Sequence, residues 1–92
     1  MLERTVTIRN ALGMHARAAA RFVHAAGAYQ CRVTVTRVDR HERRVDGKSI
    51  LGLLLLAAAR GIAIRISADG ADEAEALGAL CRLVESGFGE EP

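Results

Sequence analysis

Two side chains that can handle a phosphoryl group, His15 and Arg17, stand two residues apart where the sequence predicts the start of a helix. The first backbone N–H groups of a helix lack partners and the macrodipole is positive there, so the position suits an anion. A neutral imidazole nitrogen is a nucleophile that can attack phosphorus. We expect the backbone amides of Ala16 and Arg17, together with the Arg17 guanidinium, to hold the transferred group. The alternative is a histidine that only caps the helix or lies on the surface.

Hydrophobic periodicity predicts the elements that position this histidine. Alternating residues predict strands around Val6 and Ile8 and over residues 33–38, 43–46 and 62–67. Helical spacing predicts helices over residues 16–26, 50–56 and 71–85. The order strand, helix, strand, strand, helix, strand, helix favours an α+β fold, a two-layer open-faced sandwich. In this fold three helices cover one face of a four-stranded sheet and the other face is wet.

The two longer helices each carry an apolar stripe that should pack on the sheet. The predicted stripe of the first helix is Ala19, Phe22, Val23 and Ala26, and that of the last helix is Ala74, Leu77, Leu80, Cys81 and Val84. Half of the 92 residues are apolar, enough for one core. We therefore expect a single domain over residues 1–92, with a frayed tail at 88–92.

Several classes of protein are disfavoured by composition. The net charge of +2 is too small to argue for nucleic acid, and residues 50–59 form an apolar run too short to cross a bilayer. The first residues show no secretory signal. Cys31 and Cys81 have no metal or CxxC spacing, so we expect buried free thiols in a reducing, cytoplasmic setting.

The predicted helix over residues 50–56 is apolar on every side. A small two-layer domain can bury one face of it, which we expect to carry Leu53 and Leu56. Ile50, Leu51 and Leu54 would then form an exposed patch, which is typical of a protein-binding surface. The alternative is that the whole helix belongs to the core.

The segment Asn10-Ala-Leu-Gly-Met-His15-Ala-Arg17 resembles the active-site segment of HPr, the histidine phosphocarrier of the bacterial phosphoenolpyruvate-dependent phosphotransferase system. Gly47-Lys-Ser49-Ile-Leu-Gly-Leu53 is similar to the regulatory-serine motif of that family, and residues 66–77 fit its last strand and helix. The resemblance covers almost the whole chain and implies an antiparallel sheet in βαββαβα order.

The resemblance also implies a function. His15 would be phosphorylated by an enzyme I-type protein charged by phosphoenolpyruvate, Arg17 would be its phosphate partner, and an enzyme IIA-type histidine would receive the group. The exposed patch, with Ala20, would dock these proteins. Many members have proline after the arginine, where this chain has Ala18. Forms without this proline resemble the nitrogen-related NPr branch and certain proteobacterial HPr proteins, so sugar transport and nitrogen or potassium regulation are both candidate roles.

Ser49 has two interpretations. It is a good N-cap for the helix over residues 50–56. In the family it would also be the target of an HPr kinase/phosphorylase, and a phosphate there would add negative charge beside the docking surface, partly offset by Lys48.

The sequence shows no nucleotide-binding loop, no metal-binding constellation and no obvious carboxylate base near His15. We therefore expect a phosphoryl carrier that needs no cofactor or metal and is not an autonomous enzyme. We also expect a monomer. Two rival functions are a docking module switched by Ser49 without essential phosphotransfer, and an RNA-binding domain using Arg40, Arg43 and Arg44. The arginine-rich turn lacks stacking aromatics, and His24 and His41 lack ligand-forming neighbours, so we expect these residues to be solvated surface.

Overall fold

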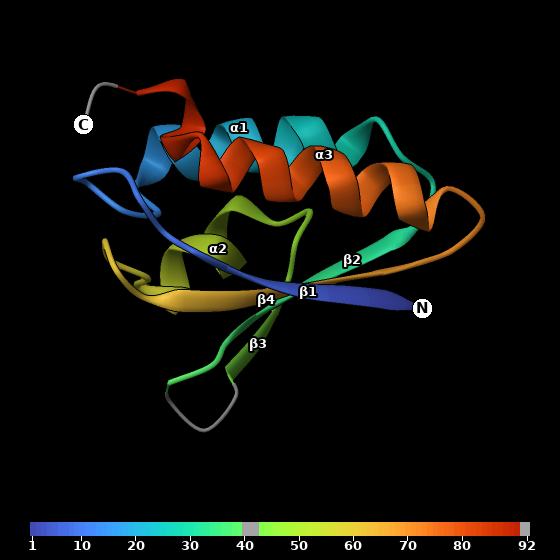
Figure 1. Cartoon of the computed structure of the whole chain (residues 1–92), viewed down its shortest axis with the longest axis horizontal. Helices are drawn as coiled ribbons and strands as arrows, with labels where there is room; N and C mark the ends of the chain where they lie inside the picture. The colour runs from blue at the N-terminus through green and yellow to red at the C-terminus, as the bar shows by residue number, and fades with distance from the viewer. Residues whose placement is uncertain (40–42, 91–92) are drawn as a thin grey trace.

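The computed structural model describes residues 1–39 and 43–90 of the chain (Figure 1). The described elements follow the order predicted from the sequence. They are β1 (Leu2–Thr7), α1 (Ala16–Gly27), β2 (Arg32–Arg37), β3 (Arg43–Asp46), α2 (Ile50–Leu56), β4 (Ala63–Asp69), α3 (Glu73–Glu85) and a short 3₁₀ turn, η1 (Gly87–Gly89). The strand β3 and the helix α2 have the bounds that their sequence patterns predict.

The four strands form one antiparallel sheet in the order β1-β4-β2-β3. The first strand pairs with the last, so residues from both halves of the chain meet in the centre of the sheet. The three helices lie on one face of this sheet, with α1 and α3 side by side (Figure 1). The predicted two-layer α+β sandwich is therefore confirmed.

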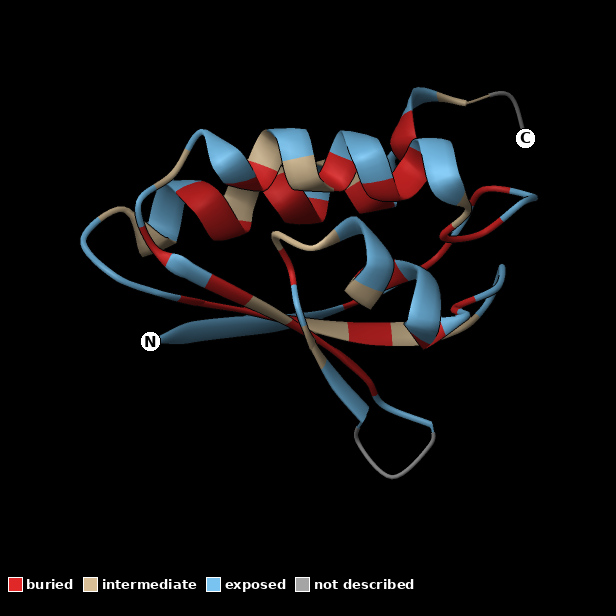
Figure 2. Cartoon of the chain, turned by 180° about the vertical axis from the view of Figure 1, so that it is seen from behind, coloured by how far each residue is buried: buried red, intermediate tan, exposed pale blue. Residues whose placement is uncertain are grey.

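The core lies between the helices and the inner face of the sheet, as Figure 2 shows by the buried segments on facing surfaces. Val33, Val35, Ile64 and Ile66 of the central strands are essentially inaccessible. The stripe of α1 is as predicted, with Ala18 added and Val23 only half-buried. In α3 the prediction for Ala74 is wrong, because Ala74 is exposed and Ala76 is buried next to Leu77. The buried side of α3 is therefore Ala76, Leu77, Leu80, Cys81 and Val84.

The end of β2 differs from the prediction. Val38 is exposed, and the inward position after Val33 and Val35 is occupied by Arg37, which is 7% exposed. Its guanidinium donates to the carbonyl oxygens of Leu56 and Ala57 at 2.9 and 3.0 Å and pairs with Asp39 at 2.6 Å. A cation therefore caps the negative end of α2, which alternation alone does not anticipate.

The structure also differs from the prediction of a frayed tail for residues 88–90. Phe88 is 1% exposed and packs in the core, and η1 turns the chain back towards the start of α1. Residues 91 and 92 of that prediction lie outside the described residues. Within the described part of the chain, no helix has the length and apolarity needed to span a bilayer.

Candidate functional site

His15 is the N-cap residue of α1, and its backbone is extended (φ −79°, ψ 178°). A tight turn precedes it, in which the Gly13 N–H donates to the Asn10 carbonyl oxygen at 3.1 Å and the His15 N–H donates to the Gly13 carbonyl oxygen at 2.9 Å. The His15 Nδ1 atom accepts a hydrogen bond from the Arg17 backbone N–H at 3.3 Å. The imidazole is therefore held at the amino end of the helix, as its position in the sequence predicts, and its side chain is 24% exposed.

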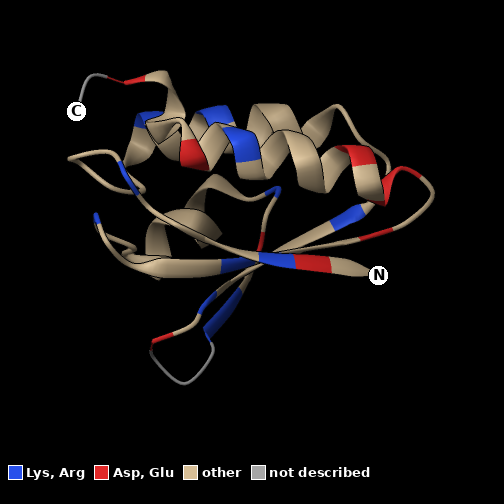
Figure 3. Ribbon diagram, in the orientation of Figure 1, with Lys and Arg blue, Asp and Glu red and all other residues tan. Residues whose placement is uncertain are grey.

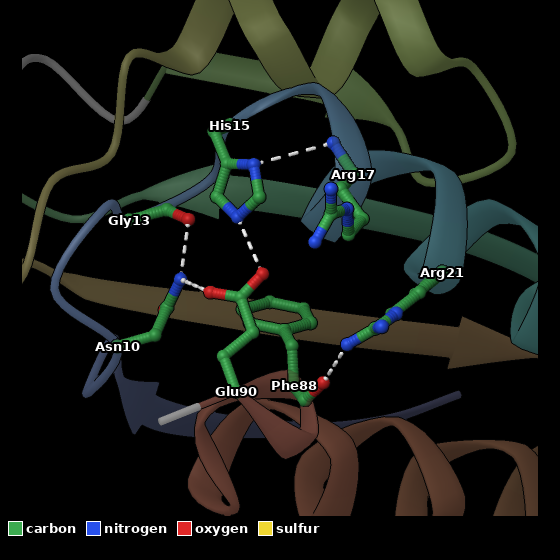
Figure 4. Close-up of polar contacts among 7 residues, drawn as sticks. All are labelled: Asn10, Gly13, His15, Arg17, Arg21, Phe88 and Glu90. Carbon is green, nitrogen blue, oxygen red and sulfur yellow. Dashed lines mark hydrogen bonds and ion pairs between the residues drawn. The ribbon is translucent and has the colours of Figure 1, made fainter. Parts of the chain in front are cut away.

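The second ring nitrogen of His15 has a partner that the sequence does not suggest. Nε2 lies 2.6 Å from Oε2 of Glu90 (Figure 4). The expectation of no carboxylate near His15 is therefore wrong. The carboxylate comes from a residue 75 positions away in the chain, and the packing of η1 delivers it.

Asn10 completes this cluster by contacting Glu90 and the turn before His15. Its Nδ2 donates to the Gly13 carbonyl oxygen at 2.7 Å and to Oε1 of Glu90 at 3.0 Å. The side chain is 1% exposed, and its Oδ1 atom is buried without a hydrogen-bond partner in the described part of the chain. A buried, unsatisfied oxygen costs about 1–3 kcal/mol. The Asn10 amide thus makes two donated hydrogen bonds while the cost of leaving its oxygen unsatisfied is borne by the fold.

The tail is fastened close to this cluster by two contacts. Phe88 fills a buried site although its φ is +58°, a strained region for a bulky residue, and Gly87 and Gly89 on either side also have positive φ. The Arg21 guanidinium of α1 donates to the Phe88 carbonyl oxygen. A signal for this anchor exists in the sequence, because an aromatic side chain in a chain with only three is expected to be buried.

The electrostatics of the cluster favour an ionised Glu90. Burial raises the pKa of its carboxyl, but hydrogen bonds from Asn10 and His15 and the charge of Arg21 outweigh burial, so the pKa lies below its ordinary value. Arg17 is exposed, and within the described residues its guanidinium makes no hydrogen bond or ion pair. Figure 3 shows the basic start of α1 and the acidic end of the tail at the same end of the molecule.

A shallow pocket opens over the cluster and brings the predicted phosphate-binding groups together. Its lining comprises Ala11, Leu12, His15, Ala16, Arg17, Arg21, Gly89 and Glu90. The pocket thus holds a nucleophilic nitrogen, helix N-terminal amides and guanidinium groups. Among the described residues no group of three or more His, Cys, Asp and Glu is arranged to hold a metal ion.

Ser49 is the N-cap of α2, as predicted, and its Oγ accepts from the Gly52 N–H at 3.0 Å. The side chain is half-buried. The Lys48 ammonium is not directed to the serine oxygen but donates to the Tyr29 carbonyl oxygen at 2.8 Å. The hydroxyl therefore has a structural task whether or not it is modified.

The apolar patch on α2 is divided as the sequence predicts. Leu53 and Leu56 are buried, while Ile50, Leu51 and Leu54 are exposed, and so is Leu55, which was not predicted to belong to the patch. We refer to these four exposed residues as the α2 patch. Ala20, the docking residue expected on α1, is exposed as well.

The remaining candidates lie away from this site. His24 is exposed on α1, and the thiols of Cys31 and Cys81 are both free and buried, as expected. Arg43 and Arg44 are exposed on β3, in the basic hairpin of Figure 3. Arg40 and His41 lie outside the described residues.

The chain is similar to proteins of one known family. The family described as "PTS HPr component phosphorylation site" matches residues 2–86. The phosphocarrier protein HPr of Neisseria meningitidis serogroup A is 49% identical over 90 residues, 98% of each chain. The phosphocarrier protein NPr of Shewanella violacea is 39% identical over 89 residues, 97% of this chain and 94% of that protein. The crystal structure of HPr-C-His from Thermoanaerobacter tengcongensis is similar with a TM-score of 0.91 at 41% identity, with 100% of both chains covered.

Proposed function

This chain belongs to the HPr family of phosphocarrier proteins, and we propose that it accepts a phosphoryl group on Nδ1 of His15 and passes it on. It is a carrier and not an enzyme. The observation that carries the proposal is the hydrogen bond from the Arg17 N–H to Nδ1. An atom that accepts a hydrogen bond has a lone pair, and this lone pair is aimed at the amino end of α1, where a phosphoryl group finds unpaired amides.

The transfer step follows from this geometry. The Nδ1 lone pair attacks phosphorus, and the bond between phosphorus and the donor atom of the charged partner breaks, with its electron pair returning to the donor. The Arg17 amide, released from Nδ1, and the Ala16 amide then face the new phosphoryl oxygens. The Arg17 guanidinium, exposed and without a partner among the described residues, supplies a charge-assisted contact.

Proteins of this family work with enzyme I and enzyme IIA, and we assign an enzyme I-type protein as donor and an enzyme IIA-type histidine as acceptor. The α2 patch and Ala20 support a docking surface around the pocket. The backbone N–H of Met14, next to His15, donates a hydrogen bond to the carbonyl oxygen of Ala58, just beyond α2. The end of α2 is thus fixed beside the nucleophile, where one partner surface can cover both.

We propose phosphorylation of Ser49 as a second, regulatory event. Its position at the edge of the α2 patch supports this role, because a phosphate there adds about −1.5 to −2 charges to an apolar docking surface. The same position favours the alternative of a docking module controlled by Ser49. That alternative does not account for the lone pair held at Nδ1.

We place the carrier, acting as a monomer, in the cytoplasm. Two free, buried thiols support a reducing compartment.

The proposal is tested by incubating the protein with enzyme I and radiolabelled phosphoenolpyruvate. We expect one acid-labile label per chain, lost in His15→Ala and retained in His24→Ala, which alters an exposed histidine on the same helix. A phosphoramidate is lost in acid, whereas phosphoserine survives. Label that persists in His15→Ala, or that resists acid, contradicts the proposal.

A further inference from the structure

We infer that Glu90 is a positioning residue that fixes the ring proton of His15 on Nε2 and so keeps Nδ1 free to accept the phosphoryl group. The inference rests on the proposed function for its kinetic consequence. It extends that function by assigning a role to the tail and to Asn10. A chain of hydrogen bonds joins the Gly13 carbonyl group through Asn10 and Glu90 to the ring of His15, and the Arg17 N–H bonds to Nδ1 on the other side of the ring (Figure 4).

The first step is the orientation of the Asn10 amide. A carbonyl oxygen only accepts, so the Gly13 oxygen at 2.7 Å requires the NH₂ group of Asn10. The same NH₂ group donates its second hydrogen to Oε1 of Glu90. Reversing the amide would place Oδ1 against two acceptors. Among residues 1–39 and 43–90, Oδ1 has no hydrogen-bond partner although Asn10 is only 1% exposed, so this orientation is kept at a cost.

The second step is the state of Glu90. Its Oε1 is occupied as an acceptor by Asn10, and its Oε2 lies 2.6 Å from Nε2 of His15. The carboxylate side chain is 15% exposed, and Arg21 is bonded to the tail two residues before it. An ionised carboxylate has only acceptor sites, so the short contact with His15 requires a proton on Nε2.

The third step comes from the other side of the ring. The Arg17 backbone N–H points at Nδ1, and a backbone N–H can only donate, so Nδ1 is the acceptor. Two contacts from different parts of the chain therefore specify one tautomer. In Ser-His-Asp hydrolases a carboxylate accepts the Nδ1 proton and leaves Nε2 free as the base. Here the two nitrogens have exchanged roles, because Glu90 accepts the Nε2 proton and Nδ1 is left free.

The tautomer matters for transfer because the Nε2 proton stays on the ring throughout. When Nδ1 forms its bond to phosphorus, the imidazole becomes positively charged. The Glu90 carboxylate, in hydrogen-bond contact with Nε2, stabilises that charge. A ring with its proton on Nδ1 has no lone pair there and cannot react at that atom.

Two substitutions at position 90 distinguish a tautomer effect from a loss of packing. Glu90→Ala removes the acceptor but leaves the Arg17 amide to hold Nδ1 as an acceptor. Glu90→Gln offers one oxygen and one NH₂ group, and Asn10 claims the oxygen. The NH₂ group then faces Nε2 and favours the proton on Nδ1. The nearly isosteric glutamine is therefore expected to be the more damaging change, whereas a purely structural role makes alanine the worse one.

The measurement is ¹⁵N NMR of the imidazole across a pH titration, which reports the tautomer of the neutral ring and requires no partner. We expect the Nε2–H form in wild type and Glu90→Ala, and a shift of the proton towards Nδ1 in Glu90→Gln. Phosphorylation by enzyme I should be slower in Glu90→Gln than in Glu90→Ala by about 10-fold or more, as expected for a wrong tautomer opposed by one remaining contact. Glu85→Gln, at an exposed acid of α3, is the matched control and should match wild type.

Identical ring signals and equal phosphorylation rates in Glu90→Gln and Glu90→Ala would overturn the inference. So would an Nδ1–H form in the wild type. These outcomes differ from a failure of the proposed function, which would appear as a wild-type chain that takes no acid-labile label. In that event the NMR measurement still decides the tautomer.

Discussion

The backbone N–H of Met14 donates a hydrogen bond of 2.9 Å to the carbonyl oxygen of Ala58. This contact fastens the turn before His15 to the segment that leaves α2. It leaves no room beside Gly13, where a Cβ atom would lie 2.6 Å from the Ala58 oxygen and 2.8 Å from the Ala59 Cα atom. Gly13 also has φ +66°, which disfavours other residues.

We therefore predict that Gly13→Ala lowers the free energy of unfolding by about 2 kcal/mol or more, through strain and displaced backbone. It should also slow phosphorylation of His15, because the turn that orients the ring must shift. The control is Gly27→Ala at the end of α1, where no atom lies within 4 Å of the added Cβ. Urea unfolding of both variants tests this, and equal stabilities would contradict it.

The capping role of Ser49 predicts a loss of stability on removing its hydroxyl. Ser49→Ala should lower the free energy of unfolding by about 1 kcal/mol, because the Gly52 N–H loses its acceptor. Ser49→Asp and Ser49→Asn should both retain the cap. Only aspartate adds charge beside the α2 patch, so only Ser49→Asp should raise the KM for this protein in transfer from enzyme I. Steady-state assays that give the same KM for both would exclude a charge effect.

Substitutions in the exposed α2 patch should weaken partner binding without lowering the stability of the fold. Leu51 is 67% exposed, so Leu51→Ser should change the free energy of unfolding by less than about 0.5 kcal/mol while weakening docking of the partner. Leu53 is fully buried two residues later, and Leu53→Ala should cost about 2–5 kcal/mol. Unfolding curves and titration calorimetry with enzyme I measure the two effects. Unchanged affinity in Leu51→Ser would place the docking surface elsewhere.

Asp72 links stability to pH. Its carboxylate accepts from the N–H groups of Gln30 and Cys31 at 2.7 and 2.9 Å, and these hydrogen bonds hold its pKa below the ordinary value. A depressed native pKa stabilises the fold above the unfolded pKa, and this stability is lost as pH falls through the native pKa. Asp72→Asn should therefore be less stable than wild type at pH 7, and the difference should shrink below about pH 4.

Urea unfolding at several pH values tests the Asp72 prediction. Glu75→Gln, at an exposed acid of α3, serves as the control and should show no such trend relative to wild type. A difference between Asp72→Asn and wild type that is constant with pH would show that the carboxylate charge is not responsible.

Local patterns predict most of the fold because each element carries its own signal. Ser49 marks the start of α2, and alternating valines and isoleucines mark β2 and β4, so these elements have the expected places. The nucleophile is equally local, since its cap geometry depends on residues 13–17. Periodicity does not predict the inward position of Arg37, because this charged side chain is held there by the end of α2, 19 residues later in the chain.

The carboxylate of the site could not be predicted in the same way. Glu90 carries no motif, and its contact with His15 depends on how Phe88 packs and on a bond from Arg21. These are tertiary contacts between segments that have no periodic relation. Polar residues near a terminus are usually poorly ordered, and only the neighbouring Phe88 indicates that this segment is packed against the domain.

The ring of His15 and the carboxylate of Glu90 are separated by 75 residues. The hydrogen bonds inside α1 join residues close in the chain, whereas the contact between Nε2 and Glu90 closes a long loop and must offset the entropy of that closure. The contact between Nε2 and the Glu90 carboxylate is therefore present only in molecules whose first and last segments have already packed together.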